Sequence, residues 1–251
     1  MEPAERVFAQ DFSAAQHTVD SGDGRNGSYV VTPGAAWCRG LFIVGALTEK
    51  RGSGDVMQAR IADPTGAFLV SVDWQSPDAV ETLGYIEPPA FVAVTGRAAL
   101  TGTGMRACAT VEAEAVNVVN RTARDLWVLS TAGATLDRLE ALRDGSERAA
   151  ASRRLYGTTD EDIRGMAEMV RTALATVRTD IAVGEIGPVV GRALLLDALE
   201  GEGGARGTGV EDAVAAGVRS GLSAREARAA LEELLAAGEC YQPASGMIKL
   251  L

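Results

Sequence analysis

The sequence predicts an α+β protein whose first half closes into a small five-stranded β-barrel and whose second half is helical. Two observations support this prediction. Between Tyr29 and Asn120, β-branched and apolar residues come in short runs that Gly, Pro, Asp and Thr interrupt, which is typical of strands and turns. From Thr122 onward, apolar residues recur every three to four positions, which is the period of helices.

Five strands are expected in the first half. The first strand is long and carries Gly45 near its middle, where a strand that serves both sides of a closed barrel must bend or bulge. In the second strand, Ala59 and Ile61 alternate with Arg60, so one face is apolar and the other is polar. The strands are expected at residues 37–49, 56–62, 67–74, 90–100 and 105–119, with a hairpin loop at 51–55 and turns at 63–66 and 101–104.

A short helix is expected between the third and fourth strands. Ser76-Pro77 opens it with proline at the first helical position, and Glu87-Pro88-Pro89 ends it. Three strands, a helix and two more strands are the order of the oligonucleotide-binding (OB) fold, a five-stranded barrel. A small β-sandwich is the alternative, but it does not need this helix.

The region after the barrel is expected to hold connecting helices. A long helix that flanks the barrel is predicted by leucines between positions 126 and 142, and the polar, alanine-rich residues 144–154 are interpreted as a linker. Thr158 or Thr159 then caps a helix that ends near Val177, with acidic residues in its first turn.

The last 70 residues are expected to form a separate winged-helix-like domain. A helix at 188–199 and a glycine-rich loop at 200–209 precede a helix at 210–218. A capping box at Ser223-Ala-Arg-Glu226 begins a third helix that ends at Ala237, and a hairpin completes the chain. The predicted domains are an N-terminal extension (1–28), an OB-fold domain (29–120), a helical connection (121–180) and a winged-helix-like domain (181–251).

The bulk composition limits the classes of function. The net charge of −10 argues against a general nucleic-acid binder, because phosphate contacts need Lys or Arg. A local arginine-lined groove can nevertheless coexist with an acidic remainder. No apolar run reaches the roughly 18 to 20 residues that span a bilayer, and residues 1–20 lack the apolar core of a signal peptide, so we expect a cytoplasmic protein.

Catalytic and metal chemistry find few candidates in this chain. Cys38, Cys108 and Cys240 lie far apart without a C-x-x-C pair, and His17 is the only histidine, which argues against a zinc site and a His-dependent triad. The glycine-bearing stretch 184–191 is not followed by Gly-Lys-Ser/Thr and is no phosphate loop. We therefore expect a protein that is not an enzyme and binds no cofactor or metal.

Sequence-tolerant binding of a single strand needs aromatic faces for base stacking and cations along a groove. Arg60 and Arg97 are the first candidates, because strand alternation points both away from the barrel core. Trp74 shares the parity of buried strand residues, so core packing is favoured over stacking, while both interpretations stay open for Phe91. The candidate nucleic-acid-binding residues are Arg60, Arg97, Trp37, Arg39, Phe91, Arg106, Trp74, Lys50 and Arg51.

Two of these candidates, Lys50 and Arg51, are expected in the first hairpin loop, where OB folds often contact a ligand, with a solvated loop charge as the equal alternative. In the third C-terminal helix, Arg225 and Arg228 are outnumbered by glutamates, which is too acidic for a reader of duplex DNA. We expect this C-terminal domain to bind protein.

Short motifs in the first half occur in an order that resembles the archaeal replication protein A-associated proteins. They are Tyr29-Val-Val-Thr-Pro33, the stretch 39–50, Asp63-Pro-Thr-Gly66 and the stretch 87–96, and Glu5-Arg-Val-Phe8 and the helix at 122–139 look similar too. The resemblance implies an OB fold, association with a replication protein A-like single-strand-binding protein, and a role in DNA replication or repair. An OB barrel followed by a winged helix also resembles the middle subunit of eukaryotic replication protein A, whose tail recruits partner proteins.

Three hypotheses follow. The first is an accessory protein or subunit that binds single-stranded DNA. The second is a structural subunit that docks a partner and does not contact DNA, which the net acidity and the outward-facing Asp73 favour. The third is an RNA-binding OB protein.

Overall fold

The computed structural model describes residues 4–21, 27–53, 56–178, 191–202 and 207–250, and its centre is a closed β-barrel. The strands follow one another around the barrel in the order β4-β5-β6-β8-β7, and β7 pairs with β4 to close it. β6 and β8 are parallel, and the other pairs are antiparallel. This is the OB order, so the predicted α+β class and OB fold are confirmed. The strands are β4 (Gly40–Ser53), β5 (Val56–Ala62), β6 (Ala67–Val72), β7 (Ala90–Thr101) and β8 (Cys108–Val118).

The long strand β4 serves both sides of the barrel, as the sequence predicted. Its first half, Gly40 to Leu47, pairs with β7, and its second half pairs with β5 from Ala46 onward. Gly45 lies where the strand changes partner, and a Cβ there would lie 2.4 Å from the carbonyl oxygen of Ala62. Only glycine therefore allows the two strands to approach this closely.

Several expected strand boundaries were wrong. The first barrel strand begins at Gly40 and not at Trp37, and the last begins at Cys108 and not at residue 105. β4 continues to Ser53, so Lys50 and Arg51 belong to a strand and not to a hairpin loop; residues 54–55 of that loop lie outside the described residues. β6 ends at Val72, where the Asp73 carboxylate accepts a hydrogen bond from the Gln75 N–H and begins a turn. Trp74 lies in this turn, so the alternation that predicted its burial no longer applies there.

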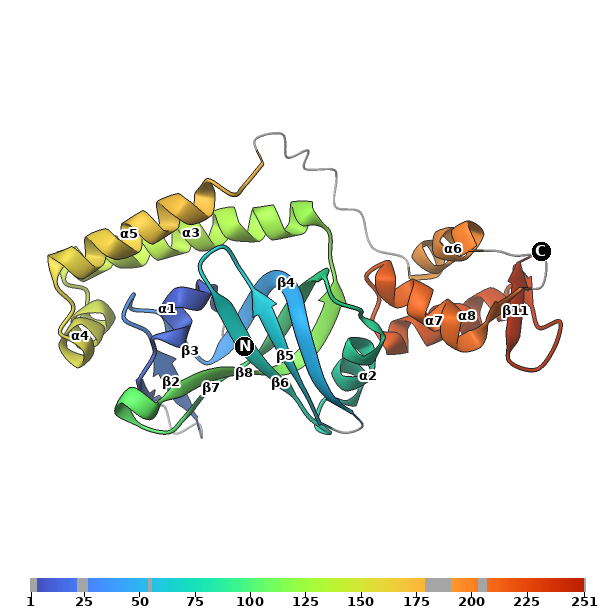
Figure 1. The fold of residues 1–251 in the computed structure, drawn as a ribbon, viewed down its shortest axis with the longest axis horizontal. Coiled ribbons are helices and arrows are strands. Elements are labelled where there is room, and N and C mark those ends of the chain that lie inside the picture. Colours follow the sequence, from blue (N-terminus) through green and yellow to red (C-terminus); the bar gives the residue numbers. More distant parts are fainter. Residues whose placement is uncertain (1–3, 22–26, 54–55, 179–190, 203–206, 251) are drawn as a thin grey trace.

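Helix α2 (Pro77–Tyr85) follows this turn and joins β6 to β7, as predicted, with proline at its start. The short 3-10 helix η1 (Gly104–Arg106) occupies the connection between β7 and β8, where a turn was expected. α2 lies at the end of the barrel that faces the C-terminal helices (Figure 1).

The N-terminal residues pack against the barrel. Helix α1 (Ala9–Ser13) is followed by a three-stranded sheet of order β1-β2-β3. Val7, Phe8 and Phe12 are fully buried in the main core, so this segment is part of the packed structure. The barrel itself begins at Gly40, and the predicted domain start at Tyr29 falls inside this N-terminal sheet. Its strands are β1 (His17–Asp20), β2 (Ser28–Val31) and β3 (Trp37–Cys38).

Three helices flank the barrel: α3 (Arg121–Asp144), α4 (Glu147–Tyr156) and α5 (Asp160–Leu174). α3 contacts β4, where the Trp127 Nε1–H donates to the carbonyl oxygen of Phe42 over 2.9 Å. The linker expected at residues 144–154 is wrong, because α4 occupies most of it. Thr159 and Asp162 form the capping box that begins α5.

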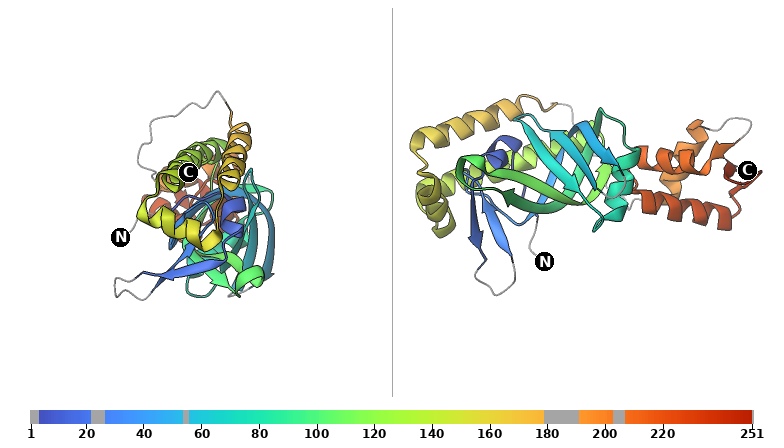
Figure 2. Two further views of the ribbon diagram at one scale, coloured as in Figure 1. Left: turned by 90° about the vertical axis from the view of Figure 1, so that its left-hand side faces the viewer. Right: turned by 60° about the horizontal axis from the view of Figure 1, so that its bottom comes forward.

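The C-terminal unit (residues 191–250) contains three helices and a hairpin in the predicted order; its identification as a winged helix stays a prediction. Residues 188–190 of the first expected helix and 203–206 of the expected loop lie outside the described residues. Figure 2 shows this unit at one end of the elongated molecule. No helix in the described ranges is long and apolar enough to cross a membrane. The elements are α6 (Gly191–Glu202), β9 (Thr208–Gly209), α7 (Val210–Arg219), α8 (Ala224–Ala236), β10 (Cys240–Tyr241) and β11 (Met247–Leu250), with sheet order β10-β11-β9.

Candidate nucleic-acid interface

A shallow groove of about 250 Å³ runs over the outside of β4, β5 and β6. These strands face the viewer in Figure 1, while α3 and α5 lie along one side of the barrel. The sequence indicates this surface, because the outward parity of β5 and β6 is readable from alternation alone. The groove is lined by Glu49, Arg51, Gln58, Ala59, Arg60 and Leu69.

The strand register arranges the outward side chains in rows. Arg60 of β5 lies between Glu49 of β4 and Leu69 of β6 in one row. The neighbouring row continues around the barrel onto β8 and β7. It ends at Arg97, the second of the two arginines that were predicted first, and it runs beside the row that contains Arg60. Its members, in order, are Arg51, Gln58, Ser71, Glu112 and Arg97.

The cations of this surface are not equivalent. Arg60 is exposed, and within the described part of the chain its guanidinium makes no ion pair. Arg51 pairs with Glu49 across 3.1 Å at the exposed rim of the groove. Arg97 lies within 3.7 Å of the Glu112 carboxylate and 3.5 Å of the Glu114 carboxylate, so two acidic groups already neutralise it. Arg60 is therefore the cation best placed to donate hydrogen bonds to a phosphate.

Exposed apolar side chains occur on β5, on β6 and in the turn after β6, and of these Leu69 lies next to Arg60. Leu69 follows it in the same row, Val56 begins β5, and Trp74 follows β6 with 68% of its surface exposed. The expected burial of Trp74 is thus wrong, and its indole is open for stacking. Strand alternation puts Leu69 on the outer face, but neither Val56 nor Leu69 was named as a binding candidate, because only aromatic and cationic groups were considered.

Lys50 points to the opposite side of β4 from Arg51. Its ammonium donates to the carbonyl oxygen of Gly84 over 2.8 Å and to the Glu87 carboxylate over 3.1 Å. The Gly84 carbonyl belongs to the last turn of α2, where a cation is favoured. Lys50 therefore holds the end of this helix and does not line the groove.

Four further candidates lie away from the groove. The Trp37 Nε1–H donates to the Ser152 hydroxyl of α4 over 3.0 Å, and the Arg39 guanidinium lies 4.9 Å from the centre of the Tyr29 ring. Phe91 is half-buried on β7, opposite Ala46 of β4. Arg106 is exposed in η1, on the loop between β7 and β8. Whether any of these residues contacts nucleic acid stays a prediction.

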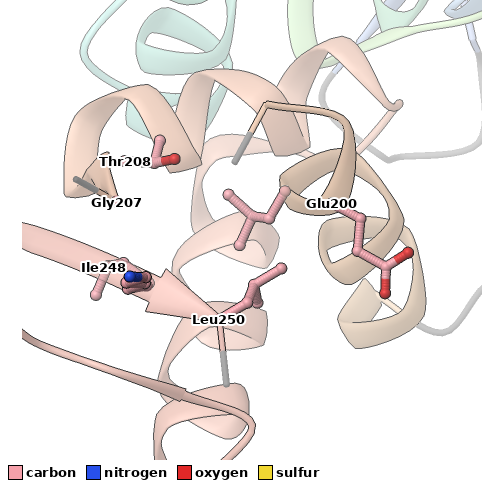
Figure 3. Close-up of a pocket in the computed structure, with 7 residues that line it drawn as sticks. Glu200, Gly207, Thr208, Ile248 and Leu250 are labelled. Carbon is pink, nitrogen blue, oxygen red and sulfur yellow. The ribbon is translucent and has the colours of Figure 1, made fainter. Parts of the chain in front are cut away.

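A second hollow of about 280 Å³ lies in the C-terminal unit, between α6 and the small sheet (Figure 3). Its floor is apolar and its rim carries one acidic and one basic residue. In the described ranges, no group of three or more His, Cys, Asp or Glu side chains could hold a metal ion. The hollow is lined by Leu199, Glu200, Gly207, Thr208, Ile248, Lys249 and Leu250.

Comparison with known proteins finds similarity in structure and not in sequence. No family model and no curated protein sequence matches the chain. Among solved structures, it is similar to a chain of a replication protein A heterotrimer bound to ssDNA, with 12% identity and a TM-score of 0.41 over 55% of this chain and 98% of that one.

Two other solved structures are similar in the same way. One is a chain of the Stn1-Ten1 complex of S. pombe, with 12% identity and a TM-score of 0.38 over 68% of this chain and 98% of that one. The other is asparaginyl-tRNA synthetase from Pyrococcus horikoshii, with 17% identity and a TM-score of 0.32 over 47% of this chain and 24% of that one. Because these TM-scores are low, the fold assignment rests on the strand order and register described above.

Proposed function

We propose that this chain is a non-enzymatic protein that binds single-stranded DNA, as an accessory protein or subunit of a replication protein A-like complex in DNA replication or repair. The observation that carries the proposal is the open groove on β4, β5 and β6, where Arg60, which makes no ion pair with any described residue, lies beside the exposed Leu69. OB folds bind oligonucleotides on these strands and on the loops beside them. The resemblance of the 29–96 motifs to archaeal replication protein A-associated proteins supports the assignment to such a complex.

In this proposal, the backbone of a single strand lies along the groove. Arg60 contacts a phosphate, and a base stacks on the indole of Trp74. Since Glu49 already pairs with Arg51, only about one or two phosphates are neutralised. The logarithm of the binding constant should then fall with the logarithm of salt concentration with a shallow slope of about −0.7 to −1.4.

Fluorescence anisotropy with a labelled oligo-dT tests the proposal. Trp74→Ala should lower the affinity by about 5- to 150-fold, because base stacking contributes about 1 to 3 kcal/mol. Arg60→Ala should lower it more than Arg97→Ala, since Arg97 is already paired with two glutamates. Arg154→Ala, an exposed arginine of α4, is the matched control. Absence of binding, or equal losses for Arg60→Ala and Arg154→Ala, would contradict the proposal.

A second candidate function is a structural subunit that docks a partner without contacting DNA. The net charge of −10 and the two carboxylates around Arg97 favour it. This function requires that the chain alone does not bind oligo-dT, but co-purifies with a co-expressed replication protein A homologue. A competition assay between single-stranded RNA and DNA separates the third candidate, an RNA-binding protein.

For the C-terminal unit, we propose a winged-helix-like domain that recruits other proteins. Its helix α8 carries Glu226, Glu232 and Glu233 on exposed positions, which disfavours contact with duplex phosphates. The hollow of Figure 3 can accept an apolar side chain of a partner against Leu199 and Ile248. Binding of the full chain to a labelled DNA duplex at physiological salt, lost on Arg225→Ala, would overturn this assignment.

A further inference from the structure

The C-terminal unit is joined to the barrel by the first turn of α8, which lies against α2 (Figure 1). The Ala224 N–H donates to the Thr82 hydroxyl over 2.9 Å, and the Arg225 N–H donates to the Asp78 carboxylate over 2.9 Å. Thr82 and Ala224 are completely buried in this contact. We call this set of contacts the α2–α8 joint.

The joint completes the hydrogen bonding of the start of α8. The helix's own capping box satisfies two N–H groups: the Glu226 carboxylate accepts from the Ser223 N–H, and the Ser223 hydroxyl accepts from the Glu226 N–H. The two N–H groups between them are satisfied by α2. A buried backbone N–H without an acceptor is strongly disfavoured, so the buried Ala224 N–H depends on the Thr82 hydroxyl, whereas the Arg225 N–H lies at the exposed edge of the joint.

Charged groups surround the joint. The Arg228 guanidinium of α8 lies 2.5 Å from the Glu81 carboxylate of α2 and 3.6 Å from the Glu211 carboxylate of α7. The Tyr85 hydroxyl of α2 donates to the Glu211 carboxylate. Burial is the main cause that raises the pKa of Tyr85, and this hydrogen bond raises the pKa further. On the barrel side, the Asn117 amide donates to the carbonyl oxygen of Gly221 over 3.1 Å.

The same helix α2 is directly continuous with the proposed DNA face. Trp74 lies in the turn that precedes α2, where the Ser76 N–H donates to the carbonyl oxygen of Asp73. Asp78, which holds α8, lies in the first turn of α2. A base stacked on Trp74 therefore restrains the chain four residues before the carboxylate that closes the joint.

We infer that the α2–α8 joint couples the barrel face to the C-terminal unit: a single strand bound at Trp74 stabilises the closed joint, and the closed joint strengthens binding at Trp74. The inference rests on the proposed function, because it needs a ligand on the face. Coupling between two sites is reciprocal in free energy. A change inside the joint, far from the groove, therefore alters affinity for the strand.

Hydrogen exchange of the Ala224 and Arg225 amides in the full chain, followed by NMR, reports how often the joint opens. Thr82→Val keeps the side-chain shape and removes the acceptor, so exchange at Ala224 should accelerate by about 5- to 150-fold. Thr131→Val is the matched control, because Thr131 is equally buried but its hydroxyl has no hydrogen-bond partner in the described structure. Protected barrel amides verify that each variant is folded.

Saturating oligo-dT should slow exchange at both amides by about 5-fold or more in the unaltered chain, and should not do so in Trp74→Ala. Thr82→Val should weaken oligo-dT binding, and Thr131→Val should not.

Should Thr82→Val fail to fold, Arg228→Glu opens the joint by repulsion from Glu81, and adding Glu81→Arg restores it. Binding of oligo-dT without any change at Ala224 and Arg225 overturns the coupling and leaves the proposed function intact, whereas no binding at all overturns both.

Discussion

Helices α1 and α8 are attached to the barrel by the same polar device at opposite ends of β6. At each site, one Asp carboxylate and one Thr hydroxyl accept hydrogen bonds from two successive N–H groups at the start of the helix. At α1, the Ala9 N–H donates to Asp63 over 2.7 Å and the Gln10 N–H donates to Thr65 over 3.0 Å. At α8, the Ala224 N–H donates to the Thr82 hydroxyl and the Arg225 N–H donates to the Asp78 carboxylate.

The two attachments differ in what surrounds them. Phe8 and Phe12, which flank the start of α1, are buried against Trp127 and Phe68, with ring centres 5.9 Å apart in both pairs. Around α8, the contact is small and its rim consists of charged side chains. The α1 attachment is thus covered by aromatic rings, whereas the buried contact between Thr82 and Ala224 at α8 is bordered by charged side chains.

This difference indicates that hydrogen-bond geometry alone does not decide how firmly a helix is held. The apolar area removed from water around the cap sets most of the free energy, and the cap mainly prevents buried N–H groups from being left without acceptors. We therefore expect matched substitutions at the two sites to have unequal effects.

The largest difference is expected between Asp63→Asn and Asp78→Asn. Asp63 accepts with both oxygens, one from Ala9 and the other from Thr65 and Gly66, so an amide NH₂ must face at least one donor. Asp63→Asn should lower the free energy of unfolding by about 2 to 3 kcal/mol. Asp78 accepts one N–H bond through one oxygen, which Asn can supply, so Asp78→Asn should cost about 0.5 kcal/mol or less. Urea unfolding of both variants measures this, and equal losses would erase the distinction.

A smaller effect is expected from Thr82→Val in the α2–α8 joint. The buried N–H of Ala224 loses its acceptor, so the free energy of unfolding of the full chain should fall by about 1 to 2 kcal/mol. Thr131→Val should not lower it, because the buried Thr131 hydroxyl bonds to nothing in the described structure and its loss breaks no hydrogen bond. Differential scanning calorimetry of the two variants makes the measurement, and a loss of similar size in Thr131→Val would show that the methyl-for-hydroxyl exchange itself is the cause.

The sequence predicted the parts of this architecture that depend on local pattern. Alternation placed β5 and the outward side of Arg60 correctly, the Ser223 capping box marked where α8 begins, and the cap expected at Thr158 or Thr159 marked where α5 begins. Gly45 marked the bend of β4 for a steric reason that the structure confirms. These features are determined by residues within a few positions of one another.

Sequence reasoning failed where the deciding partner is distant or where a pattern was extended too far. The Trp37 N–H donates to Ser152, 115 positions along the chain, a contact that no local pattern indicates. Trp74 was assigned to the core by an alternation that had already ended at Val72. The 144–154 stretch was interpreted as a linker from its polarity, although its alanines and arginines are good helix formers. The attachments of α1 and α8 to the barrel could not be inferred. Their hydroxyl and carboxylate acceptors lie far along the chain from the N–H groups that they bind, at no characteristic spacing.

The pH dependence should also separate the two attachments. Burial raises the pKa of Asp63, although hydrogen bonds from Ala9, Thr65 and Gly66 oppose the shift. Its folded pKa is therefore above its unfolded pKa, so its contribution to stability is complete below the ordinary Asp pKa and is lost as pH rises through the folded value. The stability difference between the unaltered chain and Asp63→Asn should accordingly shrink as pH increases from about 4. Urea midpoints at several pH values measure it, and a difference that grows with pH would contradict the sign.

The smallest effect is expected from the ion pairs around the α2–α8 joint. Arg228 and Glu81 keep 37% and 42% of their side-chain surfaces exposed, so solvent and salt screen their attraction. Arg228→Met keeps the apolar stem and should cost about 0.5 kcal/mol or less at low salt, and almost nothing at about 1 M salt. No comparable salt dependence is expected for Asp63→Asn, because its effect comes from lost hydrogen bonds to N–H and hydroxyl donors and not from an ion pair. Unfolding of both variants in low and high salt tests this, and a large salt-independent loss in Arg228→Met would mean that packing of the arginine stem, and not its charge, holds the rim of the joint.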